Sequence, residues 1–228
     1  MRRIDELHLK HPFMGARMPR DQLAREDIHV GRRHIGTLIR RMGIEALAPQ
    51  PGTSKAAPGN KIYPHLLRKL DINRANQVWA LDTTYIPMAK GFVYLTAVVD
   101  VASRRVLTHK VAVTLQACHA REIIEEAFAR YGMPEIVNTD QGSQFTAEEF
   151  ANAMLSKGVK LSMDGRAAWR SVKYERVYLM AYDSVSAART DTDQYFDWYN
   201  TEGPHSSLDR LTPKQVYENL LPKLAEVA

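Results

Sequence analysis

The order of hydrophobic and polar positions predicts a helical segment at the start of the chain. Residues 2–11, 19–26 and 31–42 carry apolar side chains at the spacing of amphipathic helices. In the third helix the apolar residues share one face, and four arginines lie largely off it: Arg32, Arg33, Arg40 and Arg41. Short helices with a basic outer surface indicate either a helix-turn-helix-like unit, whose last helix lies on DNA, or a small helical cap with a solvated basic face.

A different pattern begins at Val78. Residues 78–87, 92–101 and 105–113 are runs of branched and aromatic residues, separated by short turns that contain Gly91 and Ser103. Because strands that follow each other in sequence are usually neighbours in a sheet, we expect a three-stranded antiparallel meander.

Helical and strand-like segments alternate after this meander. Thr114 is expected to cap a helix that runs to about Tyr131, with a buried stripe made of Ile123, Ile124, Ala127 and Phe128. A short strand then ends at Asp140, and Thr146 opens a second helix, in capping-box form, that runs to about Lys157. Residues 159–162 form a last short strand. This order resembles the ribonuclease H-like fold, so the expected class is α/β, a mixed sheet flanked by helices.

The chain is expected to divide into three parts. Residues 48–60 are rich in proline and glycine, which is typical of an extended linker. We therefore place a helix-turn-helix-like DNA-binding part at 1–47, the linker and its lead-in at 48–76, and the catalytic core with a C-terminal helical tail at 77–228.

The charge is unevenly distributed along the chain. Residues 1–75 hold 15 Lys and Arg against 7 Asp and Glu, whereas the remaining residues hold 16 against 19. A basic segment beside a slightly acidic body suggests that one part holds a polyanion and the other carries the chemistry. The single cysteine excludes an internal disulfide, and no apolar run is long enough to cross a bilayer.

Two aspartates follow apolar strand-like runs: Asp82 and Asp140. Phosphodiester cleavage and strand transfer use two metal ions held by carboxylates that bridge and flank them, and magnesium prefers hard oxygen ligands. We therefore assign both aspartates as metal ligands, Asp82 bridging. The alternative for each aspartate is a structural role, as the cap of a turn or of a helix. Asp100 also ends a strand, but the residues that follow it suit a turn, and we interpret it as structural.

Three segments make a family resemblance specific. Residues 79–85 (Trp-Ala-Leu-Asp-Thr-Thr-Tyr), 98–104 (Val-Val-Asp-Val-Ala-Ser-Arg) and 138–145 (Asn-Thr-Asp-Gln-Gly-Ser-Gln-Phe) resemble transposases of the bacterial insertion sequence 3 family. The tail agrees, with Tyr199-Asn200, Pro204-His205, Leu208 and Thr212-Pro213. The resemblance implies a retroviral-integrase-type core with three acidic residues, Mg²⁺ as cofactor with Mn²⁺ as a substitute, and action as an oligomer on element ends and target DNA.

The chain departs from the family pattern at the third acidic residue. Its Trp169-Arg170 leads directly into a segment that follows the catalytic glutamate in the family, which suggests an internal loss around that residue. The implied spacing places the glutamate at Arg176, and Glu175 is one position earlier. Because one residue rotates a side chain by roughly 100° around a helix, Glu175 is a doubtful third catalytic residue, and a surface glutamate is the alternative.

The predicted function is DNA transposition by metal-dependent cleavage and strand transfer, in a copy that has lost activity if Glu175 cannot serve. The alternative is a non-catalytic DNA-binding remnant that modulates a full-length relative. We expect a bacterial cytoplasmic protein, associated with the nucleoid when on DNA, and an upstream reading frame as a fusion partner. His205, with Tyr199 and Asn200, is expected either to pack the tail against the core or to contact DNA.

Overall fold

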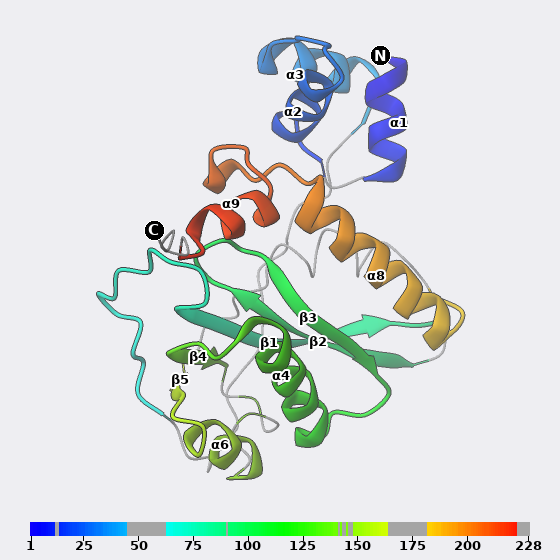
Figure 1. Cartoon of the computed structure of the whole chain (residues 1–228). Coiled ribbons are helices and arrows are strands. Elements are labelled where there is room, and N and C mark those ends of the chain that lie inside the picture. Colours follow the sequence, from blue (N-terminus) through cyan, green and yellow to red (C-terminus); the bar gives the residue numbers. More distant parts are fainter. Residues whose placement is uncertain are drawn as a thin grey trace.

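The computed structural model describes residues 1–11, 14–44, 63–89, 91–140, 142, 145, 148–163 and 182–222. Figure 1 shows a group of three helices at one end of the molecule and a sheet with helices on both faces below it. The predicted linker and the boundary at residues 47 and 48 lie outside the described residues, so this division of the chain stays a prediction.

The N-terminal group consists of α1 (Arg2–Lys10), α2 (Arg17–Arg25) and α3 (Arg32–Arg41). The three predicted helices are therefore confirmed: α1 and α3 are shorter than predicted by one and two residues, and α2 begins two residues earlier and ends one residue earlier. They share a small core of their own, built on Ile4, Leu7, Leu23 and Ile35. Leu38 and Ile39 pack against this core, so the apolar face predicted for α3 is confirmed.

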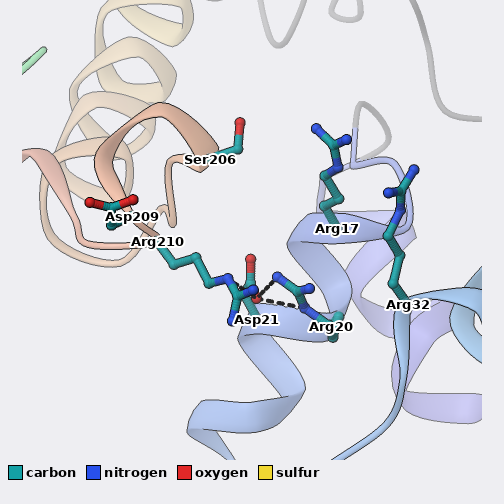
Figure 2. A pocket seen from close by; sticks show the side chains of 7 residues that line it. All are labelled: Arg17, Arg20, Asp21, Arg32, Ser206, Asp209 and Arg210. Atoms are coloured by element: carbon teal, nitrogen blue, oxygen red, sulfur yellow. Dashed lines mark hydrogen bonds and ion pairs between the residues drawn. The ribbon is translucent and has the colours of Figure 1, made fainter.

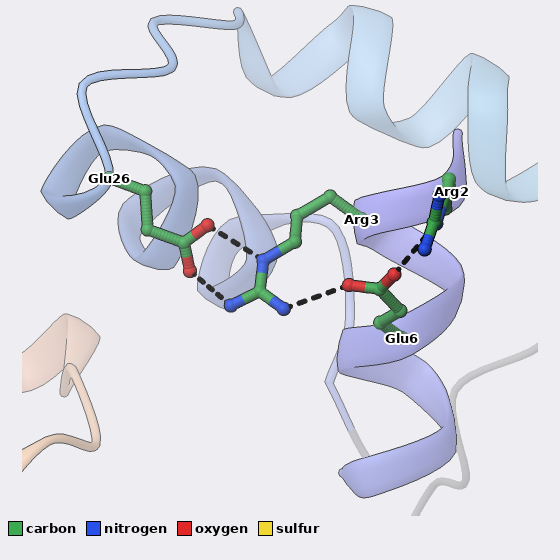
Figure 3. Close-up of polar contacts among 4 residues, drawn as sticks. All are labelled: Arg2, Arg3, Glu6 and Glu26. Atoms are coloured by element: carbon green, nitrogen blue, oxygen red, sulfur yellow. Dashed lines mark hydrogen bonds and ion pairs between the residues drawn. The ribbon is translucent and has the colours of Figure 1, made fainter.

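A surface ion-pair network ties α1 to the end of α2 (Figure 3). The Arg3 guanidinium donates to both carboxylate oxygens of Glu26, over 2.7 and 2.6 Å, and to Glu6 over 2.9 Å. These hydrogen bonds hold the pKa of Glu26 and of Glu6 below the ordinary value. The groups are exposed, so salt screens their interaction, and the apolar contacts carry most of the stability of the unit.

The larger part of the chain is built on a five-stranded sheet in the order β3-β2-β1-β4-β5. Its strands are β1 (Val78–Pro87), β2 (Phe92–Asp100), β3 (Val106–Ala112), β4 (Ile136–Thr139) and β5 (Lys160–Met163). The pairs β1–β2 and β2–β3 are antiparallel, which confirms the meander. Both β4 and β5 run parallel to β1, so each needs a helical crossover before it.

Helices cover both faces of the sheet (Figure 1). One face packs against α4 (Ala117–Tyr131) and α6 (Glu148–Leu155), and the stripe predicted for α4 is buried there. The other face packs against α8 (Val185–Thr201), whose aromatic residues Tyr195, Phe196 and Trp198 join the core of that layer. The chain continues into α9 (Pro213–Leu220), which Thr212 caps in a capping box with Gln215.

The predicted start of α4 is wrong. Its N-cap is Gln116, two residues after Thr114, and no side chain caps its backbone. Thr114 cannot serve because its hydroxyl lies 3.2 Å from Nε2 of His119 instead of meeting a backbone N–H. The capping box predicted at Thr146 lies outside the described residues.

The C-terminal tail is hydrogen-bonded to the start of the edge strand β3. The Asn200 amide accepts a hydrogen bond from the Val106 backbone N–H over 3.0 Å and donates to its carbonyl over 2.9 Å. His205 packs edge-on against Tyr199 with ring centroids 4.5 Å apart. Burial, together with nearby Arg104, lowers the pKa of His205 to about 4, so the ring is neutral at pH 7. These contacts support the packing role of the tail.

Asp100 holds the turn between β2 and β3, as predicted. It is fully buried, and its carboxylate accepts hydrogen bonds from the backbone N–H groups of Asn76 (2.8 Å) and Ser103 (2.9 Å) and from the Ser103 hydroxyl (2.6 Å). Burial raises the pKa of Asp100 in spite of these three donors. The folded state therefore binds this proton more tightly than the unfolded state does, and the contribution of Asp100 to stability falls as pH rises.

We expect Asp100→Ala to destabilise the fold by about 3 kcal/mol, because three donors lose their acceptor inside the protein. Urea unfolding of the variant and the parent chain measures the difference. Asp197→Ala, at an exposed position of α8, is the matched control and should change the free energy of unfolding by less than about 0.5 kcal/mol. Equal stability of the two variants would contradict the structural role of Asp100.

Candidate functional site

The parallel pairing of β1 with β4 brings Asp82 and Asp140 together. The last paired residues of these strands are Leu81 and Thr139. Asp82 is the next residue of β1, which continues to Pro87, and Asp140 directly follows the end of β4, so the two residues lie at the same level of neighbouring strands. Adjacent strands are roughly 4.8 Å apart, which is a suitable separation for two carboxylates that share a metal site.

Strand alternation places Asp82 on the face of the sheet that α8 covers. Its neighbour Leu81 packs in the core under α4 and α6, so Asp82 points to the opposite face. Its partner across β2 is Ala97, which belongs to the core on the α8 side. Only 9% of Asp82 is exposed. A carboxylate in such surroundings is stabilised by hydrogen bonds, an ion pair or a bound cation.

Backbone donors orient both carboxylates. The N–H of Thr83 donates to Oδ1 of Asp82 over 2.8 Å, and the N–H of Gly142 donates to Oδ1 of Asp140 over 2.9 Å. The second contact is an Asx-type turn, which the Asp-Gln-Gly order of the sequence favours. Each carboxylate is thus held by the main chain of its own segment.

Two further oxygen atoms lie on the same face of the sheet. Thr84 is two residues beyond Asp82 on β1, and Asn138 is two residues before Asp140 on β4; each is 7% exposed. Thr84 Oγ1 and Asn138 Oδ1 are buried, and neither has a hydrogen-bond partner among the residues that the structure describes. Both residues belong to the segments that carry the family resemblance, and alternation along β1 would have placed Thr84 on the same face as Asp82.

The donor set fits a hard divalent cation. Two carboxylates and two neutral oxygens are the ligands that Mg²⁺ accepts in proteins, with water completing the shell. Within the described ranges no cluster of three or more His, Cys, Asp or Glu side chains is present. Glu175, the doubtful third ligand, lies outside the described residues, and its role stays a prediction.

The four arginines predicted to contact DNA are exposed on α3. Arg32 and Arg33 lie in the first turn, and Arg40 and Arg41 in the last. None of the four side chains meets an acidic partner in the part of the chain that the structure describes. Helices long and apolar enough to cross a membrane are likewise absent from that part.

Three family models match the chain. The integrase core domain model matches residues 72–167, a second integrase core domain model matches residues 166–213, and an HTH-like domain model matches residues 1–52. The match to the HTH-like model falls on the three N-terminal helices, and the integrase core models fall on the sheet and its helices.

Curated relatives are transposases. The transposase for insertion sequence element IS904 of Lactococcus lactis is 26% identical over 205 residues, covering 80% of this chain and 78% of the relative. Transposase InsF for insertion sequence IS3A of Escherichia coli is 26% identical over 221 residues, covering 90% of this chain and 76% of the relative.

Solved integrases share the fold. The catalytic core domain of HTLV-2 integrase, solved in complex with magnesium, has a TM-score of 0.50 at 19% identity, over 62% of this chain and 96% of that one. A chain of the simian T-cell lymphotropic virus intasome, solved with a PP2A regulatory subunit, has a TM-score of 0.51 at 16% identity, over 90% of this chain and 76% of that one. The ribonuclease H-like fold prediction is therefore confirmed.

The unpartnered oxygen of Thr84 generates a prediction about stability. We expect Thr84→Val to stabilise the fold by about 1 kcal/mol, because it removes a buried hydroxyl that forms no hydrogen bond. Thr108→Val on β3 is the matched control. The Thr108 hydroxyl is also buried but donates to the Ile123 carbonyl over 3.0 Å, so its loss should destabilise the fold by about 1 kcal/mol. Urea unfolding measures both, and a loss of stability in Thr84→Val would contradict the assignment.

Proposed function

Because the chain belongs to the insertion-sequence transposases that carry an integrase core, we propose that it cleaves DNA ends and transfers them to target DNA at the Asp82–Asp140 site. The observation that supports this proposal is the register of β1 and β4, which pairs Leu81 with Thr139, the residues directly before the two aspartates. Transposition is the activity of the curated relatives; the metal site and the role of each residue are the proposal.

Asp82 and Asp140 would hold a divalent cation, Mg²⁺ or Mn²⁺ as its substitute, between them. When bound, such a cation lowers the pKa of an attacking hydroxyl and stabilises the leaving oxygen of the phosphodiester. Asp82 is proposed as the bridging ligand because it is buried at the centre of the sheet. Asp140 is proposed as the flanking ligand because it lies less buried, in the turn that follows β4.

DNA would be held outside this site by the basic N-terminal unit. Arg32, Arg33, Arg40 and Arg41 supply four exposed cationic groups at the two ends of one helix, where they can track phosphates on either side of a groove. An oligomer on DNA belongs to the same proposal, because joining two element ends to one target needs more than one copy of the site. A fusion with the product of an upstream reading frame and a location on the bacterial nucleoid are further parts of this proposal.

The catalytic role of Asp140 is tested by Asp140→Asn, which keeps the size of the side chain and removes the charge. We expect strand transfer on DNA ends, measured with Mg²⁺ and with Mn²⁺, to fall by at least about a hundredfold. Asp197→Asn, an exposed aspartate on α8, makes the same change of charge and should leave the rate unchanged. Equal activity of Asp140→Asn and the parent chain would contradict the carboxylate mechanism.

A second candidate function is that of a non-catalytic DNA-binding protein. It is favoured by the residue at the position implied for the third carboxylate, which is Arg176 and not a glutamate. Such a chain would keep the basic unit and the fold of the core, and it would act by assembling with an intact relative on the same DNA.

The two candidates are separated by restoring the missing segment. An insertion of about ten residues after Arg170, containing Asp-Asn and Glu-Arg-x-Trp, would restore the acidic residue that the resemblance implies at this point of the sequence. If the third carboxylate has been lost, we expect strand transfer to appear or to rise by at least about a hundredfold. The same insertion with glutamine in place of its glutamate is the control. Unchanged activity after the insertion would contradict the loss.

A further inference from the structure

A cavity of about 490 Å³ lies between the N-terminal helical unit and the loop that joins α8 to α9 (Figure 2). Four arginines, together with Asp21, Ser206 and Asp209, line it: Arg17, Arg20, Arg32 and Arg210. These side chains come from α2, from the start of α3 and from the tail after α8, segments far apart in the sequence. Positive groups outnumber negative ones by four to two, so the cavity suits an anion.

One wall of the cavity is fixed by ion pairs. The Arg20 guanidinium donates to Oδ1 of Asp21 over 2.8 Å, and Nε of Arg210 lies 3.7 Å from the same oxygen (Figure 2). Asp21 therefore joins α2 to the tail and is already neutralised by two arginines. The Asp21 carboxylate therefore repels an anion in the cavity less strongly than an unpaired carboxylate would.

Further contacts hold the N-terminal unit against the tail. Gln22 donates to the Glu202 carbonyl over 3.2 Å, and Arg25 donates to the same carbonyl and to that of Arg210 over 3.4 Å. The two sides of the cavity are thus fixed relative to each other without any contribution from Arg17 or Arg32. A site arranged in advance loses less entropy when its ligand binds.

Arg17 and Arg32 have no acidic partner within the described residues. Both are exposed and line the cavity, and Figure 2 shows their guanidinium groups pointing the same way. Each is the first residue of its helix, and neither helix has a side-chain cap or an acidic residue in its first turn. The backbone at both helix starts therefore adds to the positive potential of the two guanidinium groups.

We propose that this cavity binds one phosphate of the DNA backbone, with Arg17 and Arg32 as its ligands and the Ser206 hydroxyl as a further donor. The inference rests on the proposed function, from which it takes the polymer that supplies the phosphate. A guanidinium group can donate two parallel hydrogen bonds to the oxygens of a phosphate. Two such groups, each at the start of a helix, can therefore bind one phosphate together. A phosphate held here touches the N-terminal unit and the core at once, so it sets the position of the DNA relative to the catalytic sheet.

The experiment measures the affinity of the full chain for a DNA duplex of mixed sequence over a range of salt concentrations. Arg17→Ala/Arg32→Ala should weaken binding by at least about tenfold. It should also reduce the slope of log K against log salt by about 0.9, the value for one phosphate contact. Arg17→Lys/Arg32→Lys keeps the charge but cannot donate two parallel hydrogen bonds from one side chain. It should therefore bind DNA more weakly than the parent chain, with the same slope of log K against log salt.

Arg121→Ala/Arg130→Ala on α4 is the matched control, since it removes the same charge from exposed arginines on the opposite layer of the core. It should leave the slope unchanged. The phosphate site alone would be overturned if the parent chain binds DNA with a steep salt dependence and Arg17→Ala/Arg32→Ala has the same slope as the control. A parent chain that does not bind DNA would overturn the proposed function and this site together.

A free phosphate is the other source of the same chemistry. Inorganic phosphate is therefore titrated against thermal unfolding of the parent chain and of Arg17→Ala/Arg32→Ala, without DNA. A rise of Tm that the double variant abolishes, combined with an unchanged slope for DNA, would overturn the assignment to the DNA backbone. A change of slope in the DNA experiment supports it whether or not inorganic phosphate also binds.

Discussion

The parallel pairing of β1 with β4 is the constraint on which the candidate active site depends. Neither strand holds both carboxylates, and 57 residues separate Asp82 from Asp140. Only the hydrogen-bonded register, with Leu81 beside Thr139, places the two side chains at one level. Parallel strands need a crossover, and α4 supplies it, with a buried stripe that packs across the sheet. The apolar face of one helix therefore determines the geometry of a polar site on the other side of the sheet.

On the face of the sheet that carries Asp82, buried polar groups lower the stability of the fold. Some buried polar groups of the core are paired: Asp100 accepts three hydrogen bonds, and Thr108 donates to the backbone of α4. Beside Asp82, Thr84 and Asn138 keep oxygen atoms without partners. Unpaired buried oxygens are costly, and they concentrate where a ligand supplies the missing partner. The two oxygens beside Asp82 are therefore available to a ligand, although buried atoms without a partner in the described part of the chain also occur at other positions, such as Arg105 and His205.

The N-terminal unit and the core are connected in two ways. One connection is made by apolar and aromatic contacts. Met14 joins the core on the α8 side, and the His11 ring stacks on Trp198 with ring centroids 4.1 Å apart. Polar contacts of α2 with the tail then leave a cavity rich in arginine at the junction. Because one anion bound there would contact both parts, the junction can couple DNA docking to the position of the catalytic sheet.

The sequence by itself determined the secondary structure, the family and the two aspartates, because each of these is written in local patterns. Helical spacing predicted α1 to α4, runs of branched and aromatic residues predicted the meander, and apolar runs that lead into a carboxylate indicated Asp82 and Asp140 as candidate ligands. Its errors were local too, as at Thr114, where a side chain contact with His119 moved the start of α4. Tertiary structure alone decided which residues from distant segments meet. Arg17 and Arg32 line one cavity with Ser206 because of how two separately built cores pack together, and no spacing along the chain encodes that arrangement.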